Sequence, residues 1–404
     1  MPENARSQAL DWEEARRIVI ETVRALPRSS EEETVSLAEA HGRVLAQLIP
    51  ADRDYPALRR SLRDGFAVRA SDVPGTLRVR GEVRAGEGES APLQGGEALE
   101  IMTGAPVPES ADAVVMVEHV HREGDSVHVE GAVEAGQFIN RQGAEAPSGS
   151  TLIPAGTIID ASHIATLAMT GHTQVPVVRR PRVAILATGD EIVDLDTKPD
   201  PHQIRNSNSY MLATLVRTTG GEPTVLPVAG DHKEALTRLL QKGLEMDMLL
   251  VSGGVSAGKY DLVKPCLREL GVQFHFERVR VQPGQPTAFG TFEGKPVFGL
   301  PGNPGSSLVT YQLFARAALQ LLAGDNEPLL PLLSARFEAP FRHKPGLTRF
   351  LPAKLSADGQ SLRHIPWQGS SDIPALAKAN VFLVADHDRG SWEVGDSIRV
   401  MLKP

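Results

Sequence analysis

The chain has 404 residues, of which 41% are hydrophobic and 23% are charged, and its formal net charge is −8. This length is too great for one compact core and predicts several domains. The negative charge disfavours a general nucleic-acid or membrane-surface binder, because such proteins present a basic face. An anionic ligand would therefore have to be bound by local donors and not by the overall field.

The chain contains one cysteine, Cys266, which excludes an intramolecular disulfide and a cysteine-based metal site. Its place in an apolar helical pattern predicts a core residue. The first residues are polar and acidic, and no apolar run is long enough to span a bilayer. We therefore expect a cytoplasmic protein with neither a membrane nor a nucleic-acid partner.

The first third of the chain changes texture twice. Apolar spacing predicts one helix over 11–26 and a second over 35–49. Short Val-rich alternating pieces, separated by Gly, Pro and Asp, then predict a small β domain over 51–147. We assign 1–50 together with 148–178 to an N-terminal mixed domain, into which this β domain is inserted.

Strands and helices alternate over 179–324, which predicts a parallel sheet with right-handed crossovers. The expected strands are "RVAILAT", "PTVLPV", "MDMLLVSGG", "VQFHFERVRV" and "KPVFGLPG". The expected helices are "NSYMLATLVRTTGG", "DHKEALTRLLQKG", "YDLVKPCLRELG" and a segment from Gly305. Asp231 and Glu234 form an expected capping box. Five short strand patterns over 325–404 predict a C-terminal β domain.

Three loops of small residues follow the expected strands: "ATGDEIV" (187–193), "SGGVSAGKYD" (252–261) and "LPGNPGSS" (300–307). In an open parallel sheet, ligands bind outside the carboxyl ends of the strands. Glycines let backbone N–H groups approach a ligand, and a following helix adds its free amides. The three loops together therefore predict a site for phosphate or another tetrahedral oxyanion, although each alone is more often a simple turn.

Carboxylates lie in or beside the same loops. Asp190 and Glu191 follow the first strand, Asp231 opens a helix, and Asp261 ends the second loop. Carboxylates beside a phosphate site indicate a hard divalent cation such as Mg²⁺ that bridges the two. A helix cap at Asp231 and a turn residue at Asp190 are equally good alternatives. No dinucleotide fingerprint or phosphate loop of the G-x-x-x-x-G-K-[ST] type is present.

Eight motifs follow one another along nearly the whole chain: "RDGFAVRASD", "EIMTGAPVPESADAVVMVE", "NRQGAE", "ATGDEIV", "QIRNSNSYML", "VSGGVSAGKYD", "VQPGQPTAFG" and "GLPGNPGSS". In this order they resemble the molybdopterin molybdenumtransferase family, which includes the bacterial enzyme MoeA and the E domain of gephyrin. The resemblance implies a Mg²⁺-dependent transferase of molybdenum cofactor biosynthesis. Such an enzyme inserts molybdenum from molybdate into adenylylated molybdopterin and releases AMP.

The resemblance also implies a fold class: a multidomain α/β plus β protein. Its parts would be a central αβα domain of the molybdopterin-binding type, an inserted β domain, an N-terminal mixed domain that takes part in dimerisation, and a C-terminal β-barrel-like domain. In the family, the central domain of one subunit faces the inserted domain of the other. We therefore expect a homodimer with shared active sites and a transient contact with a molybdopterin adenylyltransferase.

The family motifs assign roles to individual residues. The resemblance implies catalytic roles for Asp64 and Thr103, which would reach into the partner's cleft, and for Glu191, Asp231 and Asp261. Of these, Glu191 and Asp261 are the expected metal ligands. The expected substrate contacts are Thr188, Gly189, Ser252, Gly253, Gly254, Ser256, Arg278, Gln282, Pro301, Gly302, Asn303, Pro304 and Ser370.

The oxyanion region departs from the family pattern. Gln282, Gln285 and Leu347 stand where the family often has basic residues, and Arg278 and Arg349 are basic residues nearby. Three other functions remain open: a molybdopterin adenylyltransferase, a non-catalytic scaffold, and a nucleotide-cleaving hydrolase of another pathway. The expected domains outside the central one disfavour the adenylyltransferase, and the lack of a fused module disfavours the scaffold.

Overall fold

The computed structural model describes residues 9–27, 31–87, 92–230, 232–255 and 262–403. Contacts divide the chain into two compact units. The first unit comprises Met1–Thr34, Gly42–Val44 and Pro176–Pro404, and the second comprises Val35–His41 and Leu45–Val175. The four-domain division of the chain stays a prediction beside this coarser one.

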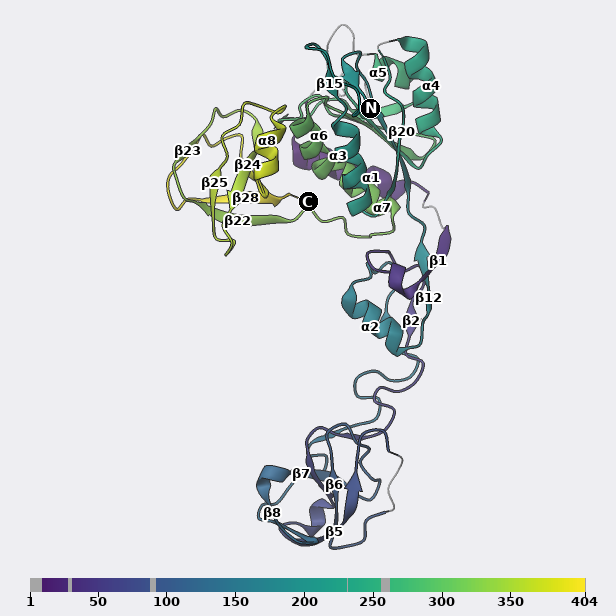
Figure 1. Cartoon of the computed structure of the whole chain (residues 1–404), viewed down its shortest axis with the longest axis vertical. Coiled ribbons are helices and arrows are strands. Elements are labelled where there is room, and N and C mark those ends of the chain that lie inside the picture. Colours follow the sequence, from purple (N-terminus) through teal and green to yellow (C-terminus); the bar gives the residue numbers. More distant parts are fainter. Residues whose placement is uncertain (1–8, 28–30, 88–91, 231, 256–261, 404) are drawn as a thin grey trace. The chain divides into compact units, whose positions relative to one another are not determined.

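A six-stranded sheet forms the centre of the first unit (Figure 1). Its order is β16 (Glu222–Val225), β13 (Arg182–Ala187), β17 (Met248–Ser252), β21 (Lys295–Leu300), β20 (Ala288–Phe292) and β18 (Gln273–Phe276). The first four strands are parallel, and β20 is antiparallel to both of its neighbours. Five strands therefore point the same way, and β20 alone runs against them.

Helices cover both faces of this sheet, which confirms the αβα prediction. Successive residues of β13 alternate between two cores: Val183 and Ile185 belong to one, Ala184 and Leu186 to the other. The first core is completed by α1 (Trp12–Ala25), α3 (Asn208–Thr218), α6 (Pro304–Thr310), a π-helical turn (Tyr311–Ala315) and α7 (Arg316–Leu322). The second is completed by α4 (Lys233–Leu244) and α5 (Val263–Glu269), and it includes the buried Cys266 as predicted.

Two predictions about secondary structure were wrong. No α-helix covers 35–49; the segment holds the end of β1 (Glu32–Ser36), a 3₁₀ turn (Leu37–Glu39) and β2 (Ile49–Pro50). A helix cannot continue through Gly42, whose φ is +73°. The expected strand "VQFHFERVRV" is divided between β18 and β19 (Val281–Gln282), which belong to different sheets, and β20 was not predicted. The expected N-cap Asp231 lies outside the described residues, and α4 begins at Lys233.

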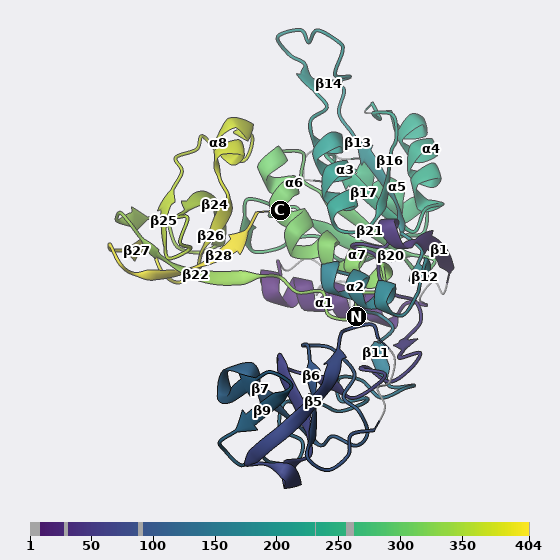
Figure 2. The same cartoon turned by 60° about the horizontal axis from the view of Figure 1, so that its bottom comes forward.

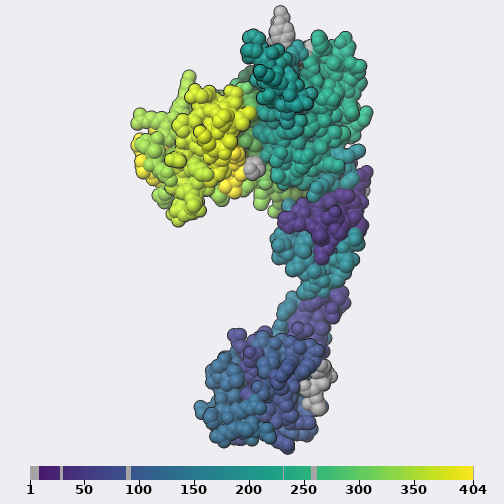
Figure 3. Space-filling view, viewed as in Figure 1, coloured from purple at the N-terminus to yellow at the C-terminus, as the bar shows by residue number. Residues whose placement is uncertain are grey.

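The C-terminal strands form the expected barrel (Figure 2). It comprises β22 (Leu332–Phe337), β24 (Thr348–Leu355), β25 (Ser361–His364), β26 (Val381–Ala385) and β28 (Ser397–Leu402), and the β24–β26 pairing closes it. A side ribbon pairs β23 (Phe341–Arg342) with β27 (Ser391–Trp392). In addition, β19 joins β24 by parallel pairing. This pairing attaches the barrel to the central domain, and Figure 3 shows the yellow-green barrel against it.

One helix of the C-terminal domain was not predicted. It is α8 (Ile373–Lys378), with the Asp372 side chain accepting a hydrogen bond from the Ala375 N–H at 3.0 Å. Amide hydrogen bonds of this kind hold the pKa of Asp372 below its usual value. This helix packs beside α6 (Figure 2) and brings the preceding loop toward the carboxyl edge of the central sheet.

Two histidines of the barrel lie in an aromatic cluster. The ring centroid of His364 is 5.1 Å from that of Phe341, and His343 stacks on Trp392 at 5.5 Å. Both ring nitrogens of His343 and Nε2 of His364 are buried without a hydrogen-bond partner in the described structure. Burial lowers the pKa of each histidine, and the positive charge of Arg349 lowers that of His343 further.

We expect the barrel to lose stability as the pH falls below about 6.5, the usual histidine value. A lowered pKa means that the unfolded chain binds these protons more readily, so the free energy of unfolding is independent of them above that pH and declines below it. Urea unfolding followed by tryptophan fluorescence at pH 7.5 and 5.5 measures this. In a His343→Gln/His364→Gln variant the pH dependence should be smaller, whereas His121→Gln, which removes an exposed ring, should leave it unchanged.

The second unit is built around another six-stranded sheet. Its order is β7 (Ala113–Met116), β4 (Gly65–Val68), β6 (Glu97–Ile101), β5 (Gly75–Val83), β9 (Ser126–Val129) and β8 (Val120–Glu123). Short antiparallel pairs join β3 (Arg60–Ser61) to β10 (Ile139–Asn140) and β2 to β11 (Thr151–Ile153). The remaining elements are α2 (Ala161–Met169) and β12 (Gln174–Val178), which pairs with β1. The β texture predicted for 51–147 is confirmed.

None of the helices in the described ranges is both long enough and apolar enough to cross a membrane.

Candidate functional site

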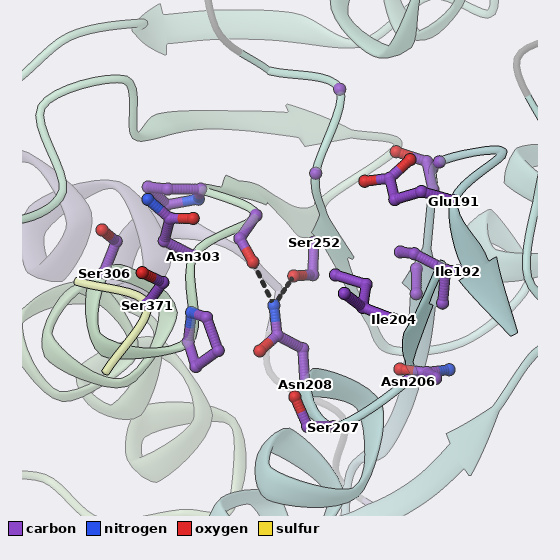
Figure 4. Close-up of a pocket in the computed structure, with 18 of the residues that line it drawn as sticks. Glu191, Ile192, Ile204, Asn206, Ser207, Asn208, Ser252, Asn303, Ser306 and Ser371 are labelled. Carbon is purple, nitrogen blue, oxygen red and sulfur yellow. Dashed lines mark hydrogen bonds between the residues drawn. The ribbon is translucent and has the colours of Figure 1, made fainter. Parts of the chain in front are cut away.

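A pocket of about 910 Å³ opens at the carboxyl ends of β13, β17 and β21 (Figure 4). Its volume lies in the range of small-molecule and cofactor sites. Most of the predicted substrate contacts line it: Thr188, Gly189, Ser252, Gly253, Gly254, Pro301, Gly302, Asn303 and Pro304, together with the predicted acid Glu191. The three glycine-containing loops therefore do converge at one edge of the sheet.

The backbone of the second loop admits only glycine. Gly253 has φ +96° and Gly254 has φ +63°, in the left-handed region. A Cβ atom at Gly253 would lie 2.6 Å from the Thr188 carbonyl oxygen, and one at Gly254 would lie 2.6 Å from a methyl group of Val263. The close approach of this loop to the end of β13 thus depends on the missing side chains.

Asn208, the first residue of α3, ties the loops together. Its Nδ2 donates to Ser252 Oγ at 2.8 Å and to the Gly302 carbonyl oxygen at 2.6 Å (Figure 4). Ser307 extends the network, because its hydroxyl donates to the Pro301 carbonyl oxygen. The Oδ1 atom of Asn208 is buried with no hydrogen-bond partner among the described residues. Asn208 belongs to the family motif "QIRNSNSYML", but it was not predicted as a site residue.

The segment between β13 and α3, which was not predicted to be part of the site, completes the wall of the large pocket. The strands β14 (Ile192–Val193) and β15 (Ile204–Arg205) pair in parallel and carry a long loop that extends from the sheet edge (Figure 2). Residues 203–208 and Pro199 line the pocket on this side, and Ser371 and Ile373 line it from the α8 region. Apolar side chains thus accompany the backbone amides of the glycine loops.

Among the described residues that line this pocket, Glu191 alone carries a carboxylate. Figure 4 shows it across the pocket from Asn303. In the described part of the chain no group of three His, Cys, Asp or Glu side chains is placed to hold a metal ion. One carboxylate nevertheless fits Mg²⁺, which usually takes one or two protein carboxylates and completes its shell with phosphate oxygens and water. Thr188 Oγ1, also buried without a partner in the described structure, is a second oxygen on the pocket wall.

A smaller pocket of about 350 Å³ adjoins the large one and shares Pro286 and Ser306 with it. It is lined by Gln282 and Ser370, both predicted, and by Arg349. The Nε atom of Arg349 is buried without a hydrogen-bond partner among the residues described. A buried guanidinium N–H with no acceptor is costly, and an oxyanion would satisfy it.

The two pockets are linked by contacts of the third loop. Asn303 Nδ2 donates to Ser370 Oγ at 2.9 Å, and the Gly305 N–H donates to the Ser370 carbonyl oxygen at 2.7 Å. These bonds hold the barrel loop that carries Ser370 against the loop that lines the large pocket. Groups bound in the two pockets would therefore be held in a fixed relation.

Asp64 and Thr103 lie in the second unit and contact each other. Asp64 Oδ1 accepts hydrogen bonds from the Thr103 N–H at 2.6 Å and from Thr103 Oγ1 at 2.7 Å. These bonds, the backbone one first, hold the pKa of the Asp64 carboxyl below its usual value. The structure thus pairs two predicted residues that are 39 positions apart in the sequence.

Four predicted residues remain. Asp231, Ser256 and Asp261 lie outside the described residues. Arg278 is exposed and belongs to the lining of neither pocket; its carbonyl oxygen accepts a hydrogen bond from the Leu10 N–H at 3.3 Å. Arg349, which the sequence offered only as a nearby basic residue, lines the smaller pocket, and the predicted contact Arg278 does not.

Comparison with known proteins gives matches along the chain. Three family models match it: the MoeA N-terminal region (domains I and II) over residues 10–171, a probable molybdopterin-binding domain over 184–321, and the MoeA C-terminal region (domain IV) over 334–403. The molybdopterin molybdenumtransferase 2 of Mycobacterium tuberculosis is 33% identical, with 96% of this chain and 98% of that protein covered.

Two further relatives agree with this. The molybdopterin molybdenumtransferase of Bacillus subtilis is 32% identical over 93% of this chain and 90% of that protein. A crystal structure of the molybdopterin biosynthesis protein MoeA from Pyrococcus horikoshii matches with a TM-score of 0.78 and 31% identity, covering 98% of this chain and 100% of that one. On the strength of these matches and of the fold, the chain belongs to the molybdopterin molybdenumtransferase (MoeA) family.

Proposed function

We propose that the protein inserts molybdenum from molybdate into adenylylated molybdopterin and releases AMP. The observation that carries this proposal is the pair of adjoining pockets at the carboxyl edge of the central sheet, which share Pro286 and Ser306. One is large enough for a nucleotide-linked pterin, and the other suits a single oxyanion. A transfer between two bound substrates requires such an arrangement.

The large pocket would hold the adenylylated pterin. The backbone amides of Gly254, Gly302 and Asn303 would face its phosphate groups, because the absence of side chains on the two glycines lets the main chain approach closely. At the start of the helical segment that begins at Pro304, Pro304 has no N–H and the Gly305 N–H is bonded to Ser370, so the Ser306 N–H is the amide that would face the ligand. Exposed apolar side chains at the rim, such as Ile204, would cover the ring systems.

The small pocket would hold molybdate. Molybdate is a dianion, and Arg349, Gln282 and Ser370 together offer it a charged donor, an amide and a hydroxyl. The unsatisfied Nε–H of Arg349 supports this assignment over one at the exposed Arg278. An arginine from β24 would thereby supply positive charge beside Gln282 and Leu347, which are uncharged.

We propose Mg²⁺ as the cofactor, with Glu191 as one ligand and Asp261, outside the described residues, as another. The ion, when bound, neutralises charge on the phosphate oxygens. The glycine-loop amides stabilise the remaining charge as a molybdate or water oxygen bonds to the adenylate phosphorus. The bond from that phosphorus to the bridging oxygen then breaks, and the bridging oxygen stays on the pterin phosphate. With water as the nucleophile AMP departs at once. With molybdate, the two pterin sulfurs would bond to molybdenum as the bond from molybdenum to the oxygen now on phosphorus breaks, so that AMP departs with that oxygen.

Asp64 and Thr103 would complete the site from the other subunit of a homodimer. An Asp64→Asn variant and an Asn208→Ala variant should then each be nearly inactive alone. Refolding an equal mixture of the two variants should restore about a quarter of the wild-type AMP release, because half of the dimers are mixed and each mixed dimer has one intact site of two. A mixture that stays inactive, while mixed dimers are detected by mass spectrometry, would contradict subunit sharing.

Purified protein incubated with adenylylated molybdopterin tests the function itself. Release of AMP should require both molybdate and Mg²⁺, and molybdenum should appear on the pterin in equal amount. ATP consumption in place of AMP release would indicate an adenylyltransferase, and AMP release indifferent to molybdate would indicate a hydrolase. We expect a cytoplasmic protein that receives its substrate through transient contact with an adenylyltransferase.

A further inference from the structure

A third pocket lies at the opposite edge of the central sheet. Its volume is about 600 Å³, and its lining is formed by Glu31, Glu33, Arg43, Arg179, Arg180, Arg182, Arg217, Gly221, Glu222 and Pro223. All of these residues belong to the first unit. Arg182 and Glu222 are the first residues of β13 and β16, so this pocket is at the amino ends of the strands. The length of β13 separates the two edges by roughly 16 Å.

Three of its five arginines are held by acidic partners. Arg43 is buried and pairs with Glu33, while its Nη2 also donates to the Val178 carbonyl oxygen at 2.9 Å. Arg179 pairs with Glu31 and, at 3.0 Å, with Asp247. These interactions fix two guanidinium groups and the backbone around them, which makes the pocket wall rigid.

Asp247 organises the floor of this region. Its Oδ2 accepts from Arg179 Nη1 at 3.0 Å and from the Arg182 N–H at 2.7 Å, and it lies 3.6 Å from Arg182 Nε. Burial alone would raise the pKa of this carboxyl, but the hydrogen bond from Arg179 and the amide bond outweigh it and keep the pKa below its usual value. Asp247 does not line the pocket, and its carboxylate holds Arg179 and Arg182 in place from behind the lining.

The other two arginines have no such partner. Neither Arg180 nor Arg217 forms an ion pair or a side-chain hydrogen bond within the described chain, and both are exposed. Arg217 comes from α3 and Arg180 from the segment before β13, so the fold brings two unpaired guanidinium groups to one pocket from separate elements. The lining holds five arginines and three glutamates, so its charge is positive in a chain whose net charge is −8.

We propose that this pocket binds a ligand carrying a chain of two or more phosphate groups. The planar guanidinium fork matches phosphate oxygens, and Arg180, Arg182 and Arg217 provide several such forks around one space. A volume of about 600 Å³ exceeds what one oxyanion fills, which favours an oligophosphate over free phosphate. The ligand could come as inorganic polyphosphate or as a nucleoside polyphosphate.

The carboxylate of Glu222 gives the proposal a sharp test. Glu31 and Glu33 are engaged by Arg179 and Arg43, whereas Glu222 adds a negative charge to the lining at the start of β16. It should therefore oppose a bound phosphate chain. Replacing it by glutamine should tighten binding several-fold, while replacing the unpaired arginines should weaken it.

The experiment is calorimetric titration of the full chain with inorganic triphosphate, repeated with adenosine triphosphate, in the absence of Mg²⁺. Each of Arg180→Gln and Arg217→Gln should weaken binding by about tenfold or more, since a hydrogen bond to a charged group contributes on that scale. Glu222→Gln should strengthen it. The nucleotide binding more tightly than the inorganic chain would identify a nucleoside polyphosphate as the ligand; equal affinity would identify the phosphate chain alone.

Two controls separate this pocket from the carboxyl-end site and from general charge effects. The double change Arg342→Gln/Arg363→Gln, at exposed positions of the barrel, should leave triphosphate affinity unchanged. The Arg180→Gln/Arg217→Gln variant should keep its AMP release from adenylylated molybdopterin. The proposal is overturned if triphosphate does not bind, if the barrel variant loses as much affinity, or if AMP release disappears with triphosphate binding.

Discussion

Replacement of Asn208 by alanine is expected to reduce kcat/KM for AMP release by about 100-fold. The variant loses the two hydrogen bonds to Ser252 and to the Gly302 carbonyl, which hold the second and third loops at the start of α3. A displacement of substrate-positioning groups by about 1 Å has effects of this size on turnover. Steady-state kinetics with adenylylated molybdopterin and saturating molybdate measures it.

The loss of activity in Asn208→Ala should come from displaced loops and not from a failure of the protein to fold. Two hydrogen bonds contribute about 1–3 kcal/mol to stability, which a domain of this size tolerates. Asn380→Ala is the matched control, because Asn380 also joins its amide to two backbone groups, those of Leu355 in the barrel. It should leave kcat/KM within about twofold of wild type. An Asn208→Ala enzyme with near-normal kcat/KM would refute the role of Asn208.

Replacement of Arg349 by glutamine is expected to raise the KM for molybdate by about 10- to 100-fold, with the KM for adenylylated molybdopterin unchanged. Arg349 is the charged donor of the smaller pocket, and its Nε has no acceptor in the described structure. Loss of a hydrogen bond to a charged ligand costs about 1.5–3 kcal/mol, and each 1.4 kcal/mol corresponds to a tenfold change in affinity.

Two further variants define this effect. Arg349→Lys keeps the charge but loses the planar fork, so its KM for molybdate should lie between those of wild type and glutamine variant. Arg363→Gln removes an exposed arginine from the neighbouring strand β25 and should change neither KM. Equal increases in both KM values in Arg349→Gln would show that this residue supports the large pocket in general and does not select the oxyanion.

The central sheet could be predicted because its strands carry their own signal. The continuous apolar runs of β13, β17 and β21 are typical of strands buried on both faces, and each ends in a loop whose glycines mark the carboxyl edge. The failure at 35–49 has the opposite cause. Its apolar residues occur at helical spacing, but the left-handed Gly42 interrupts the segment, and a period alone does not reveal that.

The strand β20 was missed because it contains Gly290 and follows Pro283, Gly284 and Pro286, a composition that resembles a loop. The two-residue turn at Glu293 and Gly294, with φ values of +47° and +77°, joins it to β21 as a hairpin. The dipeptide Glu-Gly between two apolar segments was the signal that could have identified it. The small helix α8 had a similar signal in Asp372 followed by a proline near its start.

The site residues that escaped prediction depend on distant partners. Asn208 is 44 residues from Ser252 and 94 from Gly302, so its role appears only when the sheet has assembled. From the sequence, Arg278 was the expected substrate contact, and Arg349 was only a basic residue near the oxyanion region. The parallel pairing of β19 with β24 sets Gln282 opposite Arg349, and this long-range pairing supports the proposed role of Arg349.

Diffraction from crystals soaked in molybdate, recorded on both sides of the molybdenum absorption edge, tests most directly the claim that the two pockets divide one reaction between them. The account predicts an anomalous peak within hydrogen-bonding reach of Arg349 and Ser370. A peak among the amides of the large pocket or at the arginines of the amino edge, with the small pocket vacant, would contradict it.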